Sequence, residues 1–149
     1  MEDMQGTLLG LFTEVAIIEH LVRNRESQFA ADEHAIGDFG LLNYFVLNHP
    51  SPDSVAGIAW CFQEDEAHTR AKLDSLAARA LVKLAPVTND NSSTMAMITD
   101  LGREAHQAIV AKAAPDIEAA VAEISRDDLE TTFKTLREIR LTLDNLPDR

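Results

Sequence analysis

The apolar pattern of residues 4–29 constrains the fold of this chain more than any other feature of the sequence. Its apolar side chains recur at steps of three and four, which predicts a helix with one wide apolar face: Leu8, Leu11, Phe12, Val15, Ile18, Leu21 and Val22. At ~1.5 Å per residue such a helix extends about 40 Å. A globule of 149 residues cannot cover that face by itself. The pattern therefore predicts a partner.

A second apolar pattern lies at the other end of the chain. Ser125 and Asp128 form a capping box in its Asp form, which predicts that a helix begins there. Two interleaved sets of residues at heptad spacing follow, namely Leu129, Leu136 and Leu143 with Thr132, Ile139 and Leu146. They make a short seam that ends at Pro147, as in a coiled coil of two to three heptads.

Between these ends, the pattern predicts short helices at 36–47, 55–62 and 65–79. The prolines and turn-forming residues of 48–54 exclude a helix there. In the helix at 65–79 we expect Ala67, Leu73 and Leu76 to face inward. Because the last two short helices are joined by a tight polar turn, they fit a helix-turn-helix.

A β-hairpin is predicted next. Residues 81–87 and 93–99 flank a cluster of turn residues, and the second segment alternates in polarity. Pro86 must then lie at a sheet edge. A helix follows at 101–114, Pro115 interrupts it, and 116–124 resumes a helical pattern. The expected fold is therefore a single domain, 1–149, mainly α with a small β-hairpin wing.

Composition limits the function. Apolar residues make up 46% of the chain and aromatic residues only 5%, as in packed helices. The formal net charge of −12 is unfavourable for binding nucleic acid, because cations that neutralise phosphates supply most of that affinity. The single Cys61 excludes an internal disulfide. No apolar run reaches membrane-spanning length, so we expect no membrane partner and a cytoplasmic protein.

The order of these elements, together with two local phrases, resembles the multiple antibiotic resistance regulator (MarR) family of winged-helix transcription factors. The first phrase is SLAARALVKL at 75–84, and the second ends in ITDLG at 98–102. The family-type positions are Leu76, Arg79, Leu81, Val82, the wing residue Asp90, Ile98, Thr99 and Gly102. Ala80 stands where the family usually has Gly.

The resemblance implies a homodimer in which the terminal segments 1–35 and 103–149 interleave and flank two winged helix-turn-helix lobes, 36–102. It also implies that the helix at 65–79 enters the major groove of double-stranded DNA while the wing reaches the minor groove. The implied DNA-binding residues are His68, Thr69, Arg70, Lys72, Ser92 and Ser93. An Arg70 bidentate to guanine would be the most specific of these contacts.

The sequence departs from the family where cations are expected. Ser92 stands in place of the wing arginine, and Leu84 replaces the arginine that closes the first phrase. The lobe is net −4, from eight acids and four bases. The acids are Asp38, Asp53, Glu64, Asp65, Glu66, Asp74, Asp90 and Asp100, and the bases are Arg70, Lys72, Arg79 and Lys83. We therefore expect weak, salt-sensitive DNA binding that depends on Arg70. Glu64, Asp65 and Glu66 also suit a helix N-terminus.

Other chemistry finds little support in the residues. Adjacent positions on a helix diverge, so Asp32, Glu33 and His34 do not predict a metal site. Nothing cationic near Cys61 would activate it, which favours a structural thiol. No catalytic motif or phosphate loop is present, so we expect neither an enzyme nor a cofactor.

Two functional hypotheses remain open. The first is a dimeric regulator, responsive to a small aromatic effector in a pocket that His20, Tyr44 and Trp60 could line, although Tyr and Trp on helices are more often core residues. The second is a degenerate winged-helix protein that serves as a protein-interaction or ligand-binding module without binding DNA.

Overall fold

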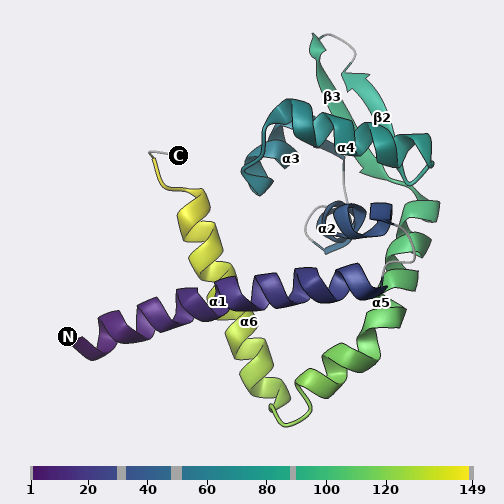
Figure 1. Cartoon of the computed structure of the whole chain (residues 1–149). Helices are drawn as coiled ribbons and strands as arrows, with labels where there is room; N and C mark the ends of the chain where they lie inside the picture. The colour runs from purple at the N-terminus through teal and green to yellow at the C-terminus, as the bar shows by residue number, and fades with distance from the viewer. Residues whose placement is uncertain (1, 30–32, 48–51, 88–89, 148–149) are drawn as a thin grey trace.

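The computed structural model describes residues 2–29, 33–47, 52–87 and 90–147. The elements in chain order are α1 (Glu2–Phe29), α2 (Glu33–Leu47), β1 (Asp53–Ser54), α3 (Val55–Phe62), α4 (Glu66–Ala78), β2 (Val82–Val87), β3 (Asp90–Ile98), α5 (Asp100–Ala120) and α6 (Arg126–Asp144). Figure 1 shows α3, α4 and the β2–β3 hairpin gathered near α2, while α1, the far half of α5 and α6 extend away from them. The predicted fold class, mainly α with a winged helix-turn-helix, is confirmed.

The wing, which is the hairpin of β2 and β3, belongs to a three-stranded antiparallel sheet with the strand order β1-β3-β2. β2 and β3 form the predicted hairpin, and their register shifts between Pro86 and Val87. Pro86 lies in the edge strand β2, as expected, because an edge strand tolerates a missing N–H. The short strand β1, which pairs Asp53 with Ala96 and Ser54 with Met95, was not predicted. It has no signal of its own, since two residues become a strand only by pairing with β3.

The core of the lobe lies between α2, α3, α4 and the sheet. Its side chains are at most 5% exposed and come from every one of these elements: Leu41, Leu42, Tyr44, Phe45, Val55, Ile58, Leu73, Leu76, Val82, Ala96 and Ile98. Leu73 and Leu76 face inward as predicted, whereas Ala67 is exposed. This core fixes the orientation of α4 relative to the wing.

The ITDLG phrase joins the lobe to α5. Thr99 caps α5, because its hydroxyl accepts from the backbone N–H of Gly102 at 3.0 Å. The same hydroxyl donates to the carbonyl oxygens of Ala80 and Leu81, at 2.6 and 3.0 Å. A Cβ on Gly102 would stand 2.1 Å from the Leu81 carbonyl oxygen, so only glycine fits this approach. The residues that resemble the family here serve structure.

The prediction that Pro115 interrupts a helix is wrong, because α5 runs through Pro115 to Ala120. Proline removes one backbone hydrogen bond and usually kinks a helix rather than ending it when good helix formers flank it. Alanines lie on both sides of Pro115, and α5 bends along its length in Figure 1. The predicted cap of the next helix is confirmed, since the Ser125 hydroxyl accepts from the Asp128 N–H at 3.1 Å.

The terminal helices leave large apolar side chains uncovered within one chain. On α1 these side chains are 41–70% exposed: Met4, Leu8, Leu9, Phe12, Val15, Ile17, Ile18, Leu21 and Val22. On α6, Leu143 is 46% exposed, while Leu136 and Ile139 are partly buried. An ion pair of 3.1 Å between Arg25 and Asp116 links α1 to α5. The expectation that the chain cannot cover its first helix is confirmed.

Candidate nucleic-acid interface

The helix-turn-helix consists of α3 and α4, each closed by its own cap. The Ser54 hydroxyl accepts from the Gly57 N–H at 2.9 Å and begins α3. Gln63 ends it in the left-handed region, with φ 54°. Asp65 begins α4, where its carboxylate accepts from the N–H groups of Ala67 and His68 at 2.9 and 3.2 Å. Asp65 therefore has the helix-capping role that the sequence allowed.

Thr69 does not face solvent, so the prediction that it faces DNA needs correction. Its side chain is fully buried in the lobe, and its hydroxyl donates to Glu64 Oε2 at 3.3 Å. Glu64 Oε1 lies 2.6 Å from Lys72 Nζ, so Glu64 links the start of α4 to its middle. Thr69 precedes Leu73 by four residues and therefore lies on the same, buried face of α4.

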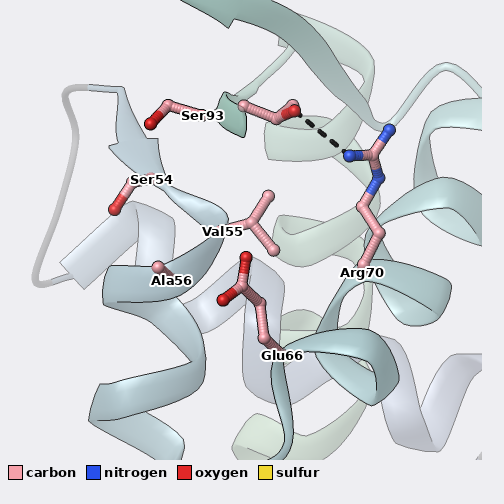
Figure 2. A pocket seen from close by; sticks show the side chains of 7 residues that line it. Ser54, Val55, Ala56, Glu66, Arg70 and Ser93 are labelled. Atoms are coloured by element: carbon pink, nitrogen blue, oxygen red, sulfur yellow. Dashed lines mark hydrogen bonds between the residues drawn. The ribbon is translucent and has the colours of Figure 1, made fainter. Parts of the chain in front are cut away.

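Arg70 is exposed but is held at both ends of its guanidinium. Its Nε lies 3.0 Å from Asp74 Oδ1 on α4, and its Nη1 donates to the Thr94 hydroxyl on β3 at 3.1 Å. Figure 2 shows this side chain reaching from α4 toward β3. Arg70 therefore links α4 to β3.

A small pocket of about 120 Å³ opens between the starts of α3 and α4 and the strand β3. Five of its seven lining residues are polar; the lining consists of Ser54, Val55, Ala56, Glu66, Arg70, Ser93 and Thr94. In Figure 2 the Glu66 carboxylate lies on the side of the pocket away from Ser93. Arg70 and Ser93, two predicted DNA contacts, thus come together here. The backbone of Ser92 lies in β3, and its side chain is outside the described residues, as is that of Asp90.

The remaining cations of the lobe are Arg79 and Lys83. Arg79 forms an ion pair with Asp38, a buried residue of α2, and its Nη2 lies 2.6 Å from Asp38 Oδ2. The two atoms are not aligned for a hydrogen bond. This pair ties α4 to α2, so the family-type Arg79 is structural. Lys83 is exposed on β2. Three of the lobe's four cations are therefore paired with carboxylates of the same chain.

The three predicted effector-pocket residues lie in different surroundings. His20 on α1 and Trp60 on α3 are exposed. Tyr44 on α2 is 5% exposed, contacts the ring of Phe62, and donates its hydroxyl to Asp53 Oδ2 at 2.7 Å. Burial, followed by the hydrogen bond to Asp53, raises the pKa of Tyr44. Tyr44 thus has the core role that is commoner for tyrosine on a helix, and the pocket stays a prediction.

A buried histidine at the junction of lobe and α5 was missed. His106 on α5 is 8% exposed, stacks on Phe39 with ring centroids 5.4 Å apart, and places Nε2 2.9 Å from Asn43 Oδ1. Burial lowers the pKa of His106. Its spacing of four from Gly102, one of the family-type positions, puts both residues on one face of α5 and was the available signal.

No group of three metal-ligating side chains gathers among the described residues. Asp32 lies outside those residues, as do the side chains of Glu33 and His34. Cys61 is partly buried on α3. In the described part of the chain, no helix is long and apolar enough to span a membrane.

Comparison with known proteins identifies the fold. No protein-family model matches the sequence, and no curated protein matches it. Among solved structures, the regulator BldR from Sulfolobus solfataricus is 19% identical, with a TM-score of 0.68 over 88% of this chain and 92% of BldR. A MarR protein from Peptoclostridium difficile is 16% identical, with a TM-score of 0.67 over 91% of this chain and 88% of that one. PcaV from Streptomyces coelicolor, solved with its natural ligand, is 16% identical with a TM-score of 0.60, covering 87% and 88%. The resemblance predicted from the sequence is confirmed at the level of the fold.

Proposed function

We propose that this chain, which has the winged-helix fold of the MarR-type transcriptional regulators, is a homodimeric DNA-binding regulator with unusually weak DNA contacts. The observation that carries the proposal is the combination of a winged helix-turn-helix with long terminal helices, matched along nearly the whole chain. In this proposal the protein is not an enzyme, needs no cofactor, and acts in the cytoplasm, where its DNA would be.

The uncovered apolar faces of α1 and α6 support the dimer. A side chain such as Leu21, 59% exposed in one chain, would be covered by a second copy of the terminal helices. Full burial of an aliphatic side chain stabilises by ~1.5 to 3 kcal/mol, and α1 alone offers many such side chains. A dimer would place two lobes on one duplex, with two copies of α4 facing successive major grooves.

The DNA contacts that we propose are fewer than the sequence suggested. Thr69 is excluded by its burial, which leaves His68, Arg70 and Lys72 on α4 and the wing residues Ser92 and Ser93. Arg70 would read guanine and Lys72 would contact a phosphate. The two serines can donate neutral hydrogen bonds but release no counterion. A lobe of net charge −4 opposes the phosphates throughout.

A small aromatic effector is part of the proposal. PcaV, a protein of the same fold, was solved with its natural ligand. His20 and Trp60 are exposed amphipathic side chains in one chain, so a second copy could enclose them beside the lobe. The buried Tyr44 would contribute only its ring.

DNA binding is tested by measuring the retardation of fragments from the flanks of the protein's own gene at low salt. We expect the wild-type chain to bind weakly and Arg70→Ala to abolish sequence preference, since a bidentate arginine contributes ~1 to 3 kcal/mol. Arg126→Ala is the matched control, because Arg126 also pairs with a carboxylate four residues away but lies on α6. Ser92→Arg should strengthen binding by tens of fold, with a gain that shrinks as salt rises.

A second candidate function follows from the ion pairs. Because Arg70, Lys72 and Arg79 are all neutralised within the chain, the lobe presents an acidic surface that fits a basic protein partner better than DNA. If no DNA fragment is retarded, and neither Arg70→Ala nor Ser92→Arg changes this result, the proposal that the chain is a DNA-binding regulator is wrong. The protein is then an interaction module without DNA binding.

A further inference from the structure

Glu64 is held in place more firmly than a surface carboxylate. Each of its two oxygens has its own partner: Oε1 lies 2.6 Å from Lys72 Nζ, and Oε2 accepts from the Thr69 hydroxyl at 3.3 Å. Thr69 is fully buried, so its hydroxyl cannot follow Glu64 into solvent. The side chains of Glu64 and Lys72 are only 27% and 31% exposed, and water screens them less than a fully exposed pair.

This pair joins the start of α4, the helix proposed to meet DNA, to the middle of that helix. Glu64 directly precedes Asp65, the N-cap of α4, and Lys72 is the residue on that helix proposed to contact a phosphate. A lysine that gains a phosphate must first lose its protein carboxylate. The exchange replaces one anion by another and releases less of the counterion atmosphere than a free lysine would.

We propose that Glu64 lowers the affinity of the chain for DNA by competing with DNA phosphates for Lys72. The inference rests on the proposed function, because it assumes that α4 faces DNA. The buried Thr69 positions the Glu64 carboxylate beside Lys72. Lys72 contributes to DNA binding only when a phosphate displaces Glu64. DNA affinity and its salt dependence are therefore lower than the number of cations on α4 predicts.

The test is the salt dependence of DNA affinity in the full-length Glu64→Gln variant, which keeps an acceptor for Thr69 and removes the charge. Each lysine that is freed to contact a phosphate steepens the slope of log K against log [salt] by about 0.9 unit, so the two lobes of a dimer together give about two units. We expect that change together with at least a tenfold gain in affinity at low salt. Glu130→Gln on α6 is the matched control, since it loses the same charge and frees Arg126 outside the lobe.

A double-mutant cycle separates competition from simple repulsion. In a Lys72→Met background, Glu64→Gln should change the DNA affinity and the salt slope no more than Glu130→Gln does, because no lysine remains to be freed. An equal gain with and without Lys72 would overturn the inference, as would a Glu64→Gln slope equal to that of the control. Circular dichroism and thermal unfolding verify that each variant folds.

The outcomes distinguish the inference from the function on which it rests. If the wild-type chain binds DNA and Glu64→Gln behaves as Glu130→Gln does, the inference alone fails. If neither the wild type nor Glu64→Gln nor Ser92→Arg binds any fragment, the proposed function fails, and the inference fails with it.

Discussion

At the scale of single residues, Ala80 stands out because it adopts a left-handed conformation, with φ 59°. An L side chain in this region costs roughly 1–2 kcal/mol, which explains why the resembling family usually has glycine here. We expect Ala80→Gly to raise the free energy of unfolding by about 0.5–1 kcal/mol, since the chain entropy of glycine offsets part of the gain. Urea denaturation measures the change.

The control for Ala80 is Ala78→Gly, at the exposed C-terminal end of α4. Glycine there removes no left-handed strain and should lower the free energy of unfolding by up to ~1 kcal/mol. If both variants lower stability, the explanation by backbone strain is wrong.

The buried His106 predicts how stability depends on pH. Burial lowers its pKa in the folded state, so the unfolded chain binds the proton more readily. The stabilisation is fully present above the ordinary pKa of about 6.5 and is lost as pH falls through the lower, folded-state pKa. We expect His106→Gln to flatten the fall in the free energy of unfolding below pH 6.5, measured by denaturation at several pH values. His68→Gln, at an exposed position, is the control.

At the scale of elements, the contact between α5 and the α4–β2 turn depends on Gly102. A Cβ there would lie 2.1 Å from the Leu81 carbonyl oxygen and 2.8 Å from Ile98 Cγ1, so backbone would have to move. We expect Gly102→Ala to lower the free energy of unfolding by about 1–3 kcal/mol. Gly40→Ala in α2, where a Cβ meets nothing within 4 Å, should raise it by roughly 0.5–1 kcal/mol. Equal effects in chemical denaturation would contradict this explanation.

At the scale of the whole molecule, the apolar faces of α1 and α6 predict an obligate dimer. Leu136 and Leu143 lie seven apart on the seam of α6, and together they would bury enough surface to contribute several kcal/mol. We expect the double variant Leu136→Asp and Leu143→Asp to dissociate or unfold the protein, and Thr135→Asp, off the seam, to leave it dimeric. A folded wild-type monomer at micromolar concentration in analytical ultracentrifugation would refute the prediction.

Most helical segments, the β-hairpin and the uncovered face of α1 could be predicted from the sequence, because they depend on periodicities and caps that are local, whereas the continuity of α5 through Pro115 could not. The spacing along α1 implied an uncovered face, and Ser125 marked the start of α6. The winged-helix fold followed from the order of the elements and from short phrases such as the one ending at Gly102.

The contacts that the side chains of α4 make could not be predicted from the sequence, because they depend on how distant elements pack. Thr69 belongs to the core because α2, α3 and the sheet cover that face, and its spacing from Leu73 was the one local hint. Arg70 is held by Thr94, which is 24 residues away, and Glu64 reaches Lys72 across two turns of helix. β1 exists only through its pairing with β3. The sequence gives the charge of each side chain but not its partner. The partner depends on which elements pack together, because ion pairs and buried contacts depend on distances in space and not along the chain.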